Sequence, residues 1–90
     1  MEKTQDNIRG LVKKVFGLNR FFGKVTNERG GLIVWNKSLI PSIAVIIFPE
    51  NDAVYVNNRK YEQRAKEFAE IYRKEFLKGT EQVTLKSEYY

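Results

Sequence analysis

The chain of 90 residues contains neither cysteine nor histidine. The absence of cysteine excludes disulfides, thiolate nucleophiles and iron–sulfur clusters, and the absence of both residues excludes the common zinc sites. Without histidine the chain also lacks the most frequent general base and the side chain that titrates near neutral pH. The carboxylates that remain are scattered along the sequence. We therefore expect a protein that is not an enzyme and that holds no metal ion or cofactor.

Long apolar runs are also missing. The longest covers residues 42–49, far fewer than the roughly 20 residues that a membrane-spanning helix needs. The first residues mix both signs of charge at Glu2, Lys3 and Asp6, whereas a signal peptide has a basic region followed by an apolar stretch. These patterns predict an intracellular, cytoplasmic protein with no membrane partner.

What the chain does contain is enough apolar material for one small domain over residues 1–90. Hydrophobic residues make up 42% of the sequence, so it is not typical of disordered chains even though 30% of its residues are charged. A domain this short buries only a modest fraction of its surface. Its core must therefore be efficient, or be completed by a partner such as a second copy in a homodimer.

The spacing of apolar residues predicts the secondary structure. Ile8, Leu11, Val12, Val15 and Phe16 fall on one face of a helix over residues 5–17. Four strands follow at residues 20–27, 32–37, 43–48 and 53–57, then a long helix at 58–78 and a short strand at 82–86. We expect an α+β domain with a four- to five-stranded, mostly antiparallel sheet and both helices packed on one of its faces.

Turn residues lie between the predicted strands. Gly30 and Gly31 suit a hairpin turn, and a strand pattern rather than a helix follows them, which excludes a phosphate-binding glycine loop. Glu50 and Asp52 flank the turn that begins at Pro49. Acidic residues in such a turn most often serve the turn itself, with a bound cation as the minor alternative.

Alternation along the strands separates the two faces of the predicted sheet. The face assigned to the core beneath the helices is almost wholly apolar and carries Phe21, Val25, Leu32, Val34, Ile43, Val45, Ile47, Val54 and Val56. The second face mixes aromatic, aliphatic, lysine and amide side chains, namely Phe22, Lys24, Thr26, Ile33, Trp35, Lys37, Ala44, Ile46, Phe48, Tyr55 and Asn57. If nothing covers the second face, it is a candidate binding surface.

The net charge of +5 is unevenly distributed. Residues 1–24 carry a net charge of +4 and residues 59–78 a net charge of +3, while the two remaining segments each carry −1. The excess positive charge therefore falls on the segments that contain the predicted helices. Such surfaces attract phosphates and acidic proteins, although a charged helix face can also serve solubility alone. Lys13 and Lys14, and the pair Arg73 and Lys74, are the candidate phosphate contacts on the helices.

Aromatic rings combined with lysines and amides suit nucleic acid, because rings stack on bases and lysines contact phosphates. The candidate site on the second face consists of Phe22, Lys24, Trp35, Lys37, Phe48, Tyr55 and Asn57. Two alternatives remain open. Trp35, Tyr55 and Phe22 can form a structural cluster covered by the C-terminal tail or by a second copy. The same face can also bind a protein, with Trp35 and Tyr55 contributing most of the affinity.

The stretch from Gly31 to Trp35, the strands at residues 42–48 and 53–57 and the helix after them resemble one half-repeat of the TATA-box-binding-protein fold. That fold is a curved antiparallel sheet gripped by a helix. The resemblance implies that the open sheet face meets the DNA minor groove, with phenylalanine wedges and asparagines reading it. Phe22, Phe48 and Asn57 lie on the matching face, and a homodimer would supply the second half.

A shorter resemblance lies near the C-terminus. Residues 84–88 are similar to the end of a small phage anti-CRISPR inhibitor. This similarity implies a different class of function, in which a small virus- or mobile-element-encoded protein binds and inhibits a host protein.

Overall fold

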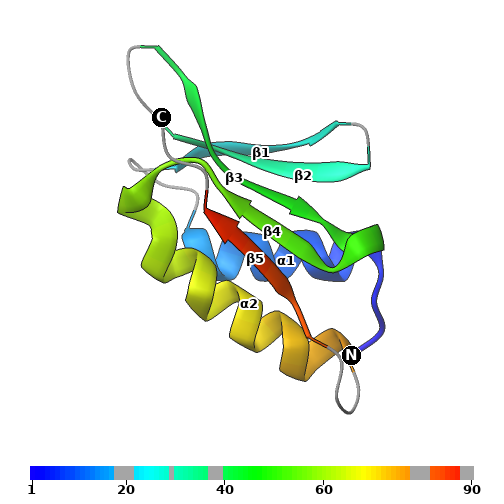
Figure 1. Ribbon diagram of the computed structural model, residues 1–90. Helices are drawn as coiled ribbons and strands as arrows, with labels where there is room; N and C mark the ends of the chain where they lie inside the picture. The colour runs from blue at the N-terminus through cyan, green and yellow to red at the C-terminus, as the bar shows by residue number, and fades with distance from the viewer. Residues whose placement is uncertain (18–21, 29, 37–39, 78–81, 88–90) are drawn as a thin grey trace.

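The computed structural model describes residues 1–17, 22–28, 30–36, 40–77 and 82–87, with residues 22–28 described by their backbone alone. The chain forms one helix, four strands, a second helix and a final strand (Figure 1). The elements are α1 (Gln5–Phe16), β1 (Phe22–Glu28), β2 (Gly31–Asn36), β3 (Ser42–Phe48), the 3₁₀ turn η1 (Pro49–Asn51), β4 (Ala53–Val56), the 3₁₀ turn η2 (Arg59–Tyr61), α2 (Glu62–Phe76) and β5 (Thr84–Ser87). This arrangement confirms the predicted α+β class.

The five strands form a single sheet in the order β1-β2-β3-β4-β5. The first four are antiparallel neighbours because short turns connect them, whereas β5 runs parallel to β4 because α2 carries the chain back across the sheet. Glu28 pairs with Gly31 at the first hairpin, where Gly30 has a φ of 77° that glycine adopts without steric cost. The sheet is thus mostly antiparallel, as the sequence predicted.

Both helices cover the same face of the sheet and run antiparallel to each other (Figure 1). At one end the guanidinium of Arg64, near the start of α2, donates to the carbonyl oxygens of Val15 and Phe16 at distances of 3.0 and 3.4 Å. At the other end the N-terminal ammonium of Met1 donates to the carbonyl of Glu75 at 3.1 Å. Among the described residues no helix is both long and apolar enough to cross a membrane.

Local sequence explains where the helices begin and end. The Thr4 hydroxyl caps α1 by accepting from the backbone N–H of Asn7 at 3.1 Å, and Gly17 ends the helix with a φ of 66°. The second helical segment begins as η2, capped by the Asn58 side chain, and continues as α2. It ends at Phe76 with an extended Leu77, and the predicted last residue of this helix, residue 78, lies outside the described residues.

The core lies between the helix pair and the sheet. Its sheet side consists of side chains at most 1% exposed, namely Leu32, Val34, Ala44, Val45, Ile47, Val54 and Val56. Its helix side includes Ile8, Val12 and Phe16 of α1 and an aromatic row on α2. Phe68 of that row contacts Phe16 of α1, with ring centroids 5.7 Å apart. Phe68 also contacts Tyr72 of α2, with ring centroids 5.8 Å apart. These offset ring contacts add to the area that the aromatic residues bury.

The prediction of which residues face the core was wrong at two adjacent positions of β3. A β-bulge shifts the register between Val34 and Trp35, so that Trp35 pairs with Ile43 and Ala44 is the extra residue. Ala44 is therefore fully buried in the core, and Ile43 lies on the second face opposite Trp35. Of the other residues predicted for the core, Phe21 lies outside the described residues and the side chain of Val25 is not described.

Candidate functional site

The second face of the sheet, on the side away from the helices, is built as rows of paired residues. Strand register aligns Ile33, Ile46, Tyr55 and Lys86 in one row across β2 to β5. A neighbouring row pairs Trp35 with Ile43, and a row on the other side contains Phe48, Ala53 and Thr84. We call these rows the outer face. Trp35 and Phe48 therefore lie on opposite sides of the central row.

Two of the predicted aromatic residues contact each other on the outer face. The rings of Phe48 and Tyr55 meet edge to face, with centroids 5.5 Å apart and an interplanar angle of 86°. The ammonium of Lys86 lies 6.0 Å from the centre of the Tyr55 ring, in cation–π geometry. Trp35, Phe48 and Tyr55 are all half-buried, which leaves part of each ring accessible to a partner.

The described part of the outer face is less open than the sequence suggested. Ile33 is only 6% exposed, although it does not belong to the core cluster. Asn57 follows β4, is half-buried, and donates its backbone N–H to the carbonyl of Ala44 at 3.0 Å. Among the described side chains of this face, Lys86 is the single cation. Apolar and aromatic side chains therefore make up most of the described part of this face.

Three predicted residues of this face have side chains outside the described part of the structure. The backbone of Phe22 pairs with Asn36, and that of Lys24 pairs with Trp35. The side chains of both are not described, and Lys37 lies outside the described residues. The predicted contribution of these three residues to a binding face stays a prediction.

A second candidate site lies on the helix layer, where the end of α1 meets the start of α2. We call it the basic end and define it by Lys13, Lys14, Arg59, Lys60 and Arg64. All five residues are exposed. Arg64 joins the two helices through its hydrogen bonds to Val15 and Phe16, and Lys60 lies 5.8 Å from the ring centre of Tyr61. Tyr61 in turn donates to the side-chain oxygen of Asn36, which ties η2 to the sheet.

The antiparallel packing of the helices segregates charge along the helix layer. Residues 8–17 carry three basic residues and no acidic residue, and residues 59–66 carry four basic residues against one acidic residue. At the opposite end, residues 1–7 and 67–77 carry more acidic than basic side chains. Part of this arrangement is structural, because cations near the end of α1 stabilise the helix dipole. The sequence predicted Lys13 and Lys14 as phosphate contacts. It did not predict such a role for Arg59, Lys60 or Arg64.

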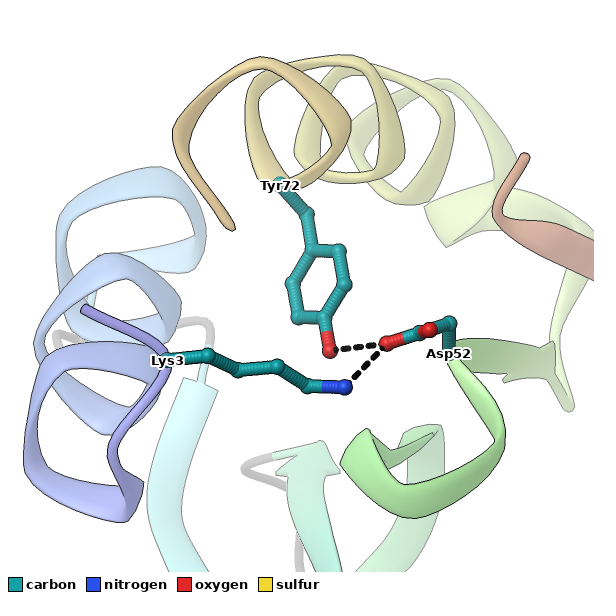
Figure 2. A network of polar contacts seen from close by, with 3 residues as sticks. All are labelled: Lys3, Asp52 and Tyr72. Atoms are coloured by element: carbon teal, nitrogen blue, oxygen red, sulfur yellow. Dashed lines mark hydrogen bonds and ion pairs between the residues drawn. The ribbon is translucent and has the colours of Figure 1, made fainter. Parts of the chain in front are cut away.

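Asp52 has a structural role in the turn after β3 (Figure 2). It adopts a left-handed conformation with a φ of 49°. One carboxylate oxygen accepts from the Lys3 ammonium at 2.6 Å and from the Tyr72 hydroxyl at 2.8 Å, and its backbone carbonyl accepts from Thr84 at 2.9 Å. Asp52 therefore joins the N-terminus, α2 and β5 at one point. The described residues contain no cluster of three acidic side chains that could hold a metal ion.

Burial, aided by this network, keeps the hydroxyl of Tyr72 in its neutral form. Its ring is buried, and burial is the main reason that the pKa of Tyr72 is raised far above its usual value. The hydrogen bond to Asp52 and the negative charge of that carboxylate raise the pKa further. Tyr72 therefore donates its hydroxyl proton in a hydrogen bond to Asp52.

Comparison of the chain with protein-family models, with curated proteins and with solved structures gave no match. The resemblances to the TATA-box-binding-protein fold and to an anti-CRISPR inhibitor therefore stay predictions.

Proposed function

We propose that this protein is a small, non-enzymatic module that binds nucleic acid through the basic end of its helix layer. The observation that carries the proposal is the segregation of charge by helix packing. Two segments far apart in the sequence, residues 13–16 and 59–64, bring five basic residues against one acidic residue to the same end of the molecule. Lysine and arginine clusters of this kind neutralise phosphates and release counterions, and this release drives sequence-independent binding.

The helix layer supports this proposal better than the outer face does. Arg64 is held in place by the α1 carbonyls and Lys60 lies against the Tyr61 ring, so part of the basic end is ordered before any ligand arrives. The outer face carries one described cation, Lys86, beside a surface of aromatic and aliphatic side chains. Phosphate contacts dominate the affinity of most such complexes, which favours the surface with more positive charge among the described side chains.

The proposal is tested by titrating labelled single-stranded DNA, duplex DNA and RNA with the protein at low and moderate salt. We expect binding that weakens steeply as salt rises. The double variant Lys13→Glu, Lys60→Glu changes one cation from each helical segment of the basic end. It should weaken binding and reduce the slope of log K against log salt by roughly 0.9 for each lost contact with duplex DNA.

The matched control is the double variant Arg73→Glu, Lys74→Glu. It lowers the net charge by the same amount, but it lies at the opposite end of the helix layer, where both residues pair with Glu70. We expect this control to bind nearly as well as the unchanged protein. Equal losses in the two variants would mean that net charge alone matters, and absence of binding at low salt would overturn the proposal.

The outer face favours a second candidate function, which is the binding of a protein partner. Trp35, Phe48 and Tyr55 remain half-buried there beside aliphatic side chains, and accessible aromatic residues are frequent anchors at protein interfaces. An inhibitor of a host protein, as the C-terminal resemblance implies, would belong to this class. The variant Trp35→Ala, Tyr55→Ala should then abolish binding of the partner in a way that does not depend on salt. If it instead abolishes binding of DNA, the outer face contacts the DNA.

A further inference from the structure

A shallow groove of about 280 Å³ runs between α1 and α2 on the side of the helix layer that faces away from the sheet. Its apolar lining comes from Met1, Gly10, Leu11, Ile71 and Phe76. Met1 is 71% exposed and Ile71 is 38% exposed, and they are two of the three large hydrophobic residues that are exposed in the described part of the chain. The groove thus gathers apolar surface that the fold itself leaves in contact with water.

The charged side chains of the groove are arranged along its length. Asp6, Glu75 and the N-terminal ammonium of Met1 line one end, which keeps a net negative charge, and Lys14 lines the other. Asp6, Gly10 and Lys14 are spaced four residues apart, so they lie on one face of α1, with Gly10 midway and the two charges about 12 Å apart along the axis. Within the described residues, none of these three charged side chains forms an ion pair. Their charges are therefore available to a partner.

We propose that this groove is a homodimer interface, in which two copies pack their helix layers against each other across a two-fold axis near Gly10 and Ile71. A two-fold axis at the midpoint reverses the direction of the second copy. Lys14 of each copy then lies opposite Asp6 and Glu75 of the other, and Ile71 of each copy enters the apolar part of the facing groove. A surface that is acidic at one end, apolar in the middle and basic at the other end is complementary to itself in this orientation.

Gly10 allows the close approach that this packing needs. A Cβ atom built at Gly10 has no neighbour within 4 Å, so the glycine is not required by packing inside the monomer. It costs helix stability at an exposed position in the middle of α1, and it has no side chain to cover the helix backbone there. A facing helix can therefore approach the backbone of α1 at this point.

The first part of the test measures the mass of the protein by sedimentation equilibrium over micromolar to millimolar concentrations. We expect a reversible dimer. The variant Ile71→Glu should raise the dimer dissociation constant by on the order of 10-fold or more. The matched control is Ile40→Glu, which changes another exposed isoleucine that does not line the groove and should leave the dimer intact. Circular dichroism checks that both variants fold.

The second part of the test exchanges charges across the proposed two-fold interface and measures association. Lys14→Glu should weaken the dimer, because it places like charges opposite Asp6 and Glu75 of the other copy. Adding Glu75→Lys in the same chain should restore most of the lost association, since each new glutamate then meets a new lysine across the interface. A monomeric wild-type protein, a dimer that survives Ile71→Glu, or failure of the second charge change to restore association would each overturn the proposal.

Discussion

The two faces of the sheet are built from the same strands but differ in what covers them. On the face beneath the helices, residues such as Val45 and Val56 are fully buried. On the outer face, Ile46 and Tyr55, which pair in the adjacent row, remain half-buried. Both faces are rich in apolar side chains, so hydrophobicity alone does not distinguish them. The difference shows that the core is decided by where two amphipathic helices can pack, and that the outer face keeps its aromatic rings partly accessible as a consequence.

The largest expected loss of stability is for a phenylalanine in the core, and a phenylalanine on the outer face provides the comparison. Phe68→Ala removes a fully buried ring that contacts Phe16 and Tyr72, and it should lower the free energy of unfolding by about 3–5 kcal/mol. Phe48→Ala removes a half-buried ring that contacts Tyr55 on the outer face, and it should cost roughly 1–2 kcal/mol. Urea denaturation measures both. Equal losses of unfolding free energy would show that packing on the outer face stabilises the fold as much as packing in the core does.

A smaller effect is expected at the junction between the helix layer and the sheet. Asp52→Ala leaves the buried Tyr72 hydroxyl without its acceptor, and the unfolding free energy should fall by about 1–3 kcal/mol. Asp52→Asn keeps an acceptor oxygen and tolerates the left-handed backbone at this position, so it should cost less. If both variants lose the same stability in urea denaturation, the ion pair with Lys3 matters more than the hydrogen bond from Tyr72.

The same junction predicts a loss of stability in alkaline solution. The pKa of Tyr72 in the folded protein is raised above its usual value of 10.0, mainly by burial. Above pH 10 the unfolded chain therefore releases this proton while the folded protein retains it, and the unfolding free energy falls as pH rises. Denaturation series between pH 8 and pH 11 should show a shallower decline for Tyr72→Phe, because phenylalanine has no proton to release. An unchanged decline would assign it to other groups, such as Tyr61, whose pKa is also raised by burial.

The smallest effect is expected on the surface of the helix layer. Gly10→Ala adds a methyl group where no atom lies within 4 Å, and alanine favours helix more than glycine does. The unfolding free energy should rise by about 0.5–1 kcal/mol in thermal or urea denaturation of the monomer. Gly30→Ala is the contrasting control, because the φ of 77° at Gly30 strains any residue with a Cβ atom. A gain at Gly30 or a loss at Gly10 would contradict this view of the two glycines.

Much of the fold was predictable because its signals are local. Apolar periodicity identified both helices and the strands, and the predicted starts and ends of β2, β3 and β4 lie within one residue of the observed ones. The β-bulge at Trp35 was not predictable, because a one-residue shift in register is decided by pairing between strands and leaves no mark in the alternation of β3 itself. The bulge places Ala44 in the core and Ile43 on the outer face, which is the reverse of the prediction.

The candidate site was predicted only in part. Trp35, Phe48 and Tyr55 were correctly placed on the face away from the helices, because alternation determines the face of each residue within a regular strand. The sequence also showed basic residues on both helical segments. It could not show that Arg64 would meet the end of α1 and bring Lys13 and Lys60 to the same end of the molecule.

The amino-acid sequence by itself determined the elements of this protein, since helix periodicity, strand alternation, caps and turns depend on residues close together in the chain. Tertiary structure alone decided which way α1 and α2 face each other, where β5 joins the sheet, and that Asp52 would meet both Lys3 and Tyr72. The physical reason is that these contacts join residues separated by tens of positions. Their free energy depends on how complete elements pack together, and no local pattern of residues records that packing.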